Sequence, residues 1–99
     1  MDEMIKELNK YPNGTVLTIK WENNLVLKGE IDTIYETDNG LESDSSEYQE
    51  FYVCLVMILE ILCIPKEGTE LETDSLIEIS MQNPPAEITL ENGLAIWKI

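Results

Sequence analysis

The chain has 99 residues, with 20 Asp and Glu against six Lys, no Arg and no His, and its formal net charge is −14 at pH 7. A chain of this length is expected to fold as a single domain covering residues 1–99. Without His, the composition excludes Ser-His-Asp catalysis and His metal ligands, and without Arg it excludes a bidentate grip on phosphate. The negative field repels nucleic acids and anionic membranes and favours a basic protein partner, although it can also serve solubility alone.

The first residues predict a short amphipathic helix over about residues 2–10. Acidic residues open this segment and lysines close it, in the order that the helix dipole favours. Pro12 then disfavours helical geometry and ends it. The segment has no apolar signal core, so we expect the protein to keep it. Apolar side chains recur at helical spacing at Met1, Met4, Ile5, Leu8 and Tyr11.

Two half-buried strands are predicted over about residues 15–21 and 25–36, because apolar and polar residues alternate along both. A two-residue turn between them would place Ile19 opposite a lysine. A three-residue loop, residues 22–24, keeps the apolar residues of both strands on one face, so it is the expected connection. Asn24 would then adopt the left-handed conformation next to a bulge.

Residues 37–50 form a polar, acidic loop that carries the predicted partner site. The twelve residues from Glu36 to Glu47 have Gly40 in the fifth place, whereas a calcium loop needs glycine in the sixth, so no metal site is predicted. Tyrosines beside this loop suit a protein interface, where aromatic residues are common anchors. We therefore predict that a partner protein contacts Glu36, Asp38, Glu42, Asp44, Glu47, Glu50, Tyr35 and Tyr48.

The stretch of residues 51–64 is apolar except for Glu60. It is too short to cross a membrane as a helix, which needs about 20 residues. We predict a long strand over about residues 48–64 whose odd-numbered residues face the core. The even-numbered face is either partly covered, or the strand bends so that both faces become core in different halves. A buried helix stays open as the alternative, because an unbroken apolar run does not reveal its period. The even-numbered face then needs cover from the N-terminal helix or from a second subunit, so a monomer or a homodimer is expected.

Two cysteines, Cys54 and Cys63, lie in the same apolar run. Their odd separation puts them on opposite faces of one strand, so they cannot easily bridge each other. No basic neighbour in the sequence activates either thiol. We predict that both are reduced core thiols of a cytoplasmic protein.

The rest of the chain predicts a second polar loop over residues 65–74 and strands over about residues 76–81, 86–91 and 94–99. Asn92-Gly93, between the last two strands, is a strong signal for a two-residue hairpin turn. The resulting register keeps one face apolar. It pairs Ala86 with Ile99, Glu87 with Lys98, Ile88 with Trp97, Thr89 with Ile96 and Leu90 with Ala95.

These elements predict a mainly β fold, in which a short N-terminal helix is followed by a bent antiparallel sheet of five or six strands, or by a small barrel. Residues 15–39 resemble the first motif of the Sm-like proteins, among the SH3-like small β-barrels. Gly29, Ile31 and Asn39 match that motif, while Tyr35 stands at the family's Asp position. In Sm-like proteins this Asn and an Arg of a second motif belong to the RNA pocket. The chain has no Arg, so RNA binding is not carried over from the resemblance.

The predicted function is that of a small, acidic, non-enzymatic binding module without a cofactor. It would contact a basic protein surface, as an inhibitor, an immunity-type factor or a nucleic-acid mimic does. No spacing of its many carboxylates marks a catalytic cleft. The alternative is an Sm-like homo-oligomeric scaffold or an RNA-associated protein. The mass in solution and an assay for binding of single-stranded RNA separate the two.

Overall fold

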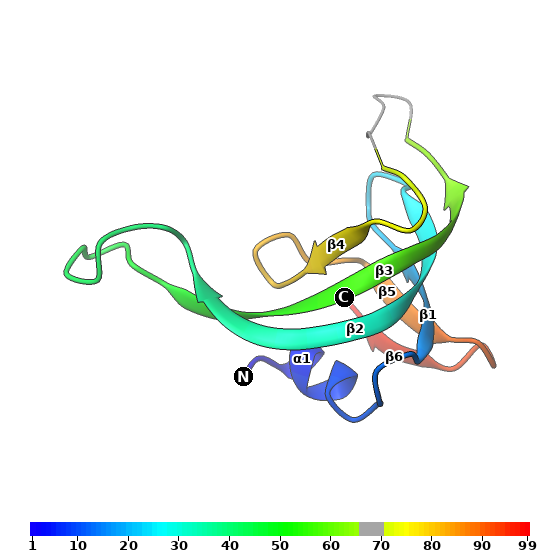
Figure 1. Cartoon of the computed structure of the whole chain (residues 1–99), viewed down its shortest axis with the longest axis horizontal. Helices are drawn as coiled ribbons and strands as arrows, with labels where there is room; N and C mark the ends of the chain where they lie inside the picture. The colour runs from blue at the N-terminus through cyan, green and yellow to red at the C-terminus, as the bar shows by residue number, and fades with distance from the viewer. Residues whose placement is uncertain (66–70) are drawn as a thin grey trace.

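The computed structural model describes residues 1–65 and 71–99. The fold is mainly β, as predicted: a short helix precedes one open antiparallel sheet with the strand order β4-β3-β2-β1-β5-β6 (Figure 1). Of the polar loop predicted over residues 65–74, residues 66–70 lie outside the described part. The elements are α1 (Glu3–Leu8), β1 (Val16–Lys20), β2 (Val26–Asp38), β3 (Glu50–Cys63), β4 (Leu76–Ile79), β5 (Glu87–Leu90) and β6 (Ala95–Lys98).

Helix α1 begins where Asp2 caps it, since the Asp2 Oδ1 atom accepts a hydrogen bond from the Ile5 backbone N–H at 2.8 Å. A helix of six residues is too short to be stable alone, so it depends on the sheet. Met4, Ile5 and Leu8 are fully buried, and the helix packs against β3 and β6. Apolar burial on one face of α1 therefore stabilises both the helix and the sheet.

The connection between β1 and β2 confirms the three-residue loop. The Trp21 backbone N–H donates to the Leu25 carbonyl oxygen at 2.9 Å, and Ile19 lies opposite Leu27. Asn24 has a φ of 73°, which is the expected left-handed conformation. This loop keeps the apolar residues of both strands on the same side of the sheet.

Gly29 allows β3 to lie very close to β2. A Cβ atom at this position would overlap the Val56 Cγ1 atom and would lie 2.8 Å from the Met57 carbonyl oxygen. The pairing of β2 with β3 shifts register beside Gly29 and again between Ile31 and Thr33. Such irregularities increase the local bend of a strand, and Figure 1 shows both strands strongly curved.

Residues 50–63 form a strand, which settles the choice between strand and buried helix. The odd-numbered face is fully buried only at Val53. The fully buried residues that follow, Cys54, Val56 and Ile58, lie on the even-numbered face, whereas Leu59 is 39% exposed, so a purely odd-numbered core face is wrong. Val56 and Ile58 pair with Ile31 and Gly29 of β2, whose side of the sheet faces the core. Both faces of β3 are apolar, so only its register with β2 and the position of α1 decide which side is buried.

The tail hairpin keeps part of the predicted register. Glu87 lies opposite Lys98 and Ile88 opposite Trp97, as expected. The two-residue turn is wrong, because the Leu90 backbone N–H donates to the Leu94 carbonyl oxygen at 2.9 Å and closes a three-residue loop. The Asn92 Oδ1 atom accepts from the Leu94 N–H at 2.9 Å, and Gly93 has a φ of 87°. Thr89 consequently pairs with Ala95, so the predicted Thr89–Ile96 and Leu90–Ala95 pairs do not form.

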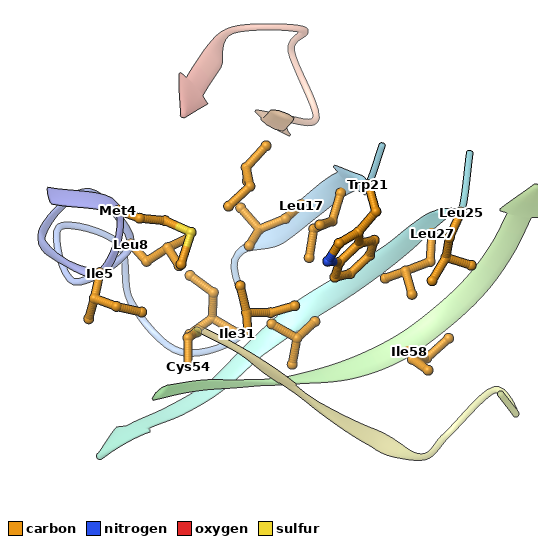
Figure 2. Close-up of a cluster of buried hydrophobic side chains, with 14 residues drawn as sticks. Met4, Ile5, Leu8, Leu17, Trp21, Leu25, Leu27, Ile31, Cys54 and Ile58 are labelled. Atoms are coloured by element: carbon orange, nitrogen blue, oxygen red, sulfur yellow. The ribbon is translucent and has the colours of Figure 1, made fainter. Parts of the chain in front are cut away.

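One apolar cluster lies between α1 and the strands of the sheet (Figure 2). Figure 2 shows the side chains of α1 at one end of this cluster, with Trp21 and Leu25 towards the other. Cys54 belongs to the cluster, whereas Cys63 is exposed, so the prediction of two core thiols is right for Cys54 alone. Both cysteines are free thiols.

Candidate functional site

The most prominent feature of the molecule is a two-stranded arm, defined here as residues 35–53. Strand β1 reaches β2 only as far as Glu30, and β4 pairs with β3 only from Cys54 to Met57. In the described part, β2 and β3 therefore continue as a pair with no third strand beside them. The arm and its loop extend along the long axis of the molecule, which measures 43 × 33 × 25 Å (Figure 1).

The two strands of the arm carry carboxylates that lie close together. Asp38 is directly opposite Glu50 in the β2–β3 ladder, and Glu36 is opposite Tyr52. All three carboxylates belong to exposed residues. Cross-strand neighbours of this kind have Cβ atoms about 5 Å apart, so the like charges repel one another.

The loop at the end of the arm is closed by hydrogen bonds of its own. The Asn39 side chain donates from Nδ2 to the Glu47 carbonyl oxygen at 2.8 Å, and the Asn39 backbone N–H donates to the Gln49 carbonyl oxygen at 3.1 Å. The Asp38 Oδ1 atom accepts from the Gly40 N–H at 2.8 Å. These bonds turn the chain around and leave the side chains of Glu42, Asp44 and Glu47 exposed.

The two predicted tyrosines lie in different surroundings. Burial raises the pKa of Tyr48, and the charges of Glu50, Asp38 and Glu36 raise it further, so these four residues form one group. Tyr35 instead donates a hydrogen bond from its hydroxyl to the Glu78 Oε1 atom at 3.0 Å. This bond is the main cause of the raised pKa of Tyr35, and it ties the arm to β4.

The lysines of the described residues form no ion pair with the arm. Among residues 1–65 and 71–99, the ion pairs join Lys6 to Glu3, Lys10 to Glu7, Lys28 to Glu91 and Lys98 to Glu87. None of these pairs includes a carboxylate of the arm. The negative charge of the arm is therefore available to an external cation or to a basic surface.

Two hollows, each with a volume of about 510 Å³, lie on the surface. One is lined by Trp21, Leu25 and Ile77 among others, and the Trp21 Nε1 atom donates to the Asn83 carbonyl oxygen at 3.4 Å. The other lies beside the arm and includes Glu36 and Glu50 in its lining. Only the second hollow contains residues that the sequence assigned to the partner site.

Neither a metal site nor a membrane-spanning helix is found in the described residues. No group of three or more His, Cys, Asp or Glu side chains is arranged to hold a metal ion there. No helix in the same residues is long and apolar enough to cross a membrane.

The comparison with protein families is decisive for the general role. All 99 positions, residues 1–99, match the family model described as "Cognate immunity protein YxxD". The chain belongs to this family. Comparison with curated proteins gave no match, and neither did comparison with solved structures.

Membership in this family makes the chain an immunity protein, whose role is to bind a protein partner. A cognate immunity protein implies that this partner is a toxin. Of the functional classes predicted from the sequence, the immunity-type binding module is therefore supported. The Sm-like resemblance of residues 15–39 stays a prediction.

The structure brings only some of the predicted contact residues of this immunity protein together. Glu36, Asp38, Glu50 and Tyr48 form one group on the arm. The carboxylates of Glu42, Asp44 and Glu47 lie in the loop, and Tyr35 is bonded to Glu78 instead. Sequence reasoning did not assign the other residues that line the hollow beside Glu36, because they come from distant segments with no common motif.

Proposed function

We propose that this immunity protein neutralises its toxin by binding a basic surface of the toxin with the arm, residues 35–53, and that it has no enzymatic activity of its own. The observation that carries the proposal is the set of arm carboxylates that no lysine of the described residues neutralises. A concentrated negative field accelerates association with a basic partner, and opposite charges at the contact hold it in register.

The projection of the arm supports the same proposal. A ribbon of two strands is only marginally stable in water, so the long β2–β3 pair needs support where it leaves the sheet. The Tyr35–Glu78 hydrogen bond links the arm to β4, and Val53 of the arm is fully buried, so both supply such support. A supported ribbon with an exposed acidic loop can enter a concave surface of the toxin without a large loss of conformational entropy.

The experiment compares two variants with the same change in charge. The arm variant replaces Glu36, Asp38, Glu42, Asp44, Glu47 and Glu50 with Gln or Asn. The control variant makes the same replacements at six exposed carboxylates outside the arm, which are Glu22, Asp32, Glu60, Glu72, Asp74 and Glu91. The toxin is captured from a lysate of the producing cells at low salt, identified and purified.

The proposal predicts that the arm variant binds the purified toxin at least about tenfold more weakly than the control variant, and that it fails to protect cells that express the toxin. Circular dichroism and thermal unfolding establish that both variants fold. Equal loss of affinity in both variants would show that only the total charge matters. Full protection by the arm variant would exclude the arm as the binding surface.

Location and assembly follow from the same properties. We place the protein in the cytoplasm, where its free thiols Cys54 and Cys63 stay reduced. We expect a monomer or a homodimer that binds no nucleic acid, because a net charge of −14 opposes both large self-assemblies and contact with phosphates. Tight binding of single-stranded RNA, or the mass of a ring, would instead favour the Sm-like alternative.

A further inference from the structure

The hollow beside the arm is a groove built from four separate parts of the chain, one of which is β2 with Glu36. Met1 comes from the N-terminus, Phe51 and Tyr52 from the start of β3, and Met81 from the connection between β4 and β5. Met1 is 49% exposed and Met81 is 40% exposed, while the two aromatic residues are half-buried. The groove therefore presents apolar and aromatic surface to water. Its volume of about 510 Å³ falls within the range of about 300–1,000 Å³ that is usual for ligand-binding clefts.

Three carboxylates line the same groove, and they are not equally free. Asp2 already accepts the hydrogen bond that caps α1. Glu36 and Glu50 are exposed, and no lysine of residues 1–65 and 71–99 forms an ion pair with either.

We infer that this groove is the docking site for an arginine side chain on the toxin, an inference that rests on the proposed function. A guanidinium group stacks on aromatic rings and donates parallel hydrogen bonds to carboxylates, which is the combination that Tyr52, Glu36 and Glu50 offer. The aliphatic part of the same side chain can lie along apolar surface such as that of Met81. A lysine matches the charge but not the stacking or the parallel hydrogen bonds.

A second copy of this chain is not the occupant. The sequence contains no arginine, and two copies would bring two charges of −14 together. The charge of the groove instead complements a basic protein. Arginine is also among the residues that contribute most to binding where they are buried at protein interfaces.

The first test needs no toxin, because the four methionines serve as probes within the protein. Met1 and Met81 line the groove, whereas Met4 is fully buried in the core and Met57 lies in the middle of β3. The protein is labelled with ¹³C at the methionine methyl groups and titrated with N-acetyl-arginine N-methylamide. The matched probe is the citrulline analogue, which has nearly the same shape and no charge.

The inference predicts that the arginine probe shifts the methyl signals of Met1 and Met81 in a saturable way and leaves those of Met4 and Met57 in place. The citrulline probe should cause no such shift. Replacing both Glu36 and Glu50 with Gln should weaken binding of the arginine probe about fivefold, the upper range for exposed charge pairs. The inference would be overturned by equal responses to the two probes, by shifts of all four methionines, or by no shift.

The second test uses the purified toxin and places a cation in the groove. Met81→Arg fills the groove from within the chain, and Leu94→Arg adds the same charge at a residue that is 57% exposed in the β5–β6 turn. We expect Met81→Arg to weaken toxin binding at least about tenfold and Leu94→Arg to leave it within about twofold. If the wild type binds the toxin and the two variants bind it equally well, the groove is not the docking site while the proposed function stands. If the wild type does not bind the toxin, the proposed function fails, whatever the methionine signals show.

Discussion

Asp38 and Glu50 lie directly opposite each other in the last pair of the β2–β3 ladder, and both are exposed. Like charges at directly opposed positions destabilise a sheet. The same sheet contains the attractive arrangement as well, since Glu87 lies opposite Lys98 with 3.9 Å between Oε2 and Nζ. The arm therefore holds an arrangement that reduces stability, as expected where a surface is kept for binding rather than for folding.

Reversing one charge of this pair should raise the stability of the fold and weaken toxin binding. Glu50→Lys places opposite charges across the ladder, so we expect the free energy of unfolding to rise by about 0.5 kcal/mol in chemical denaturation. The same change should weaken toxin binding. Glu87→Lys is the matched control, because it converts the attractive pair with Lys98 into a repulsive one and should lower stability by a similar amount. A lower stability for Glu50→Lys would show that repulsion across this pair is not significant.

The buried thiol predicts a pH dependence of stability at alkaline pH. Burial, with a smaller contribution from the charge of Asp32, raises the pKa of Cys54 from 9.0 to about 12. Because the pKa of this thiol is raised in the folded state, the buried neutral thiol contributes fully to stability below pH 9. This stabilisation is lost as the pH rises from 9 to 12. Between pH 8 and pH 10, the free energy of unfolding should therefore fall by about 1 kcal/mol more in the wild type than in Cys54→Val.

Cys63→Val provides the comparison for this measurement, because Cys63 is exposed. It should show the same decrease between pH 8 and pH 10 as the wild type. Equal pH dependence in Cys54→Val and the wild type would mean that the Cys54 thiol titrates normally in the folded protein.

The two tryptophans should differ in their effect on stability. Trp21 is 7% exposed and belongs to the core, whereas Trp97 is half-buried and donates from Nε1 to the Pro85 carbonyl oxygen at 3.2 Å. We expect Trp21→Ala to lower the free energy of unfolding by about 3–5 kcal/mol and Trp97→Ala by about 2 kcal/mol. Urea denaturation of both variants measures the difference. A larger loss for Trp97 would contradict the burial described here.

The close approach of β3 to β2 makes Gly29 sensitive to a single methyl group. Gly29→Ala would place Cβ against Val56 and the Met57 carbonyl oxygen, and the backbone atom cannot move away easily. We expect a loss of about 1–3 kcal/mol, as for other overpacked sites. Gly14→Ala tests backbone strain without crowding, because Gly14 has a φ of 91° and nothing lies within 4 Å of the added Cβ atom. It should cost about 1 kcal/mol or more through backbone strain alone. Thermal unfolding of Gly29→Ala at the wild-type midpoint would contradict this account.

The alternation of apolar and polar residues was sufficient to predict the short loop between β1 and β2. The alternation around residues 15–36 predicted the three-residue connection and the left-handed Asn24, because a two-residue turn would have placed Ile19 opposite a lysine. The tail hairpin shows the limit of such reasoning. Asn92-Gly93 fits both a two-residue turn and a three-residue loop, and the hydrogen bond from the Leu94 N–H to Asn92 favours the longer loop.

Tertiary contacts decided the features that the sequence left open. Strand β3 is apolar on both faces, so its buried side depends on its register with β2 and on the position of α1. The acidic loop of residues 37–50 was predicted from composition alone, since its carboxylates are neighbours in the sequence, whereas the two-stranded arm that carries it was not predicted. The groove was not predicted, because Met1, Tyr52 and Met81 meet only when the sheet has formed.

The most direct test of the account is the association rate constant with the toxin, measured at several ionic strengths for the wild type, the arm variant and the control variant. If the arm charges guide binding, the wild type and the control variant should associate fast at low salt and slow down together as salt rises. The arm variant should associate slowly at low salt and depend little on salt, so that all three rates converge at high ionic strength. If the association rate constant changes neither with salt nor with the arm substitutions, the account is contradicted. The negative charge of the arm would then serve solubility alone.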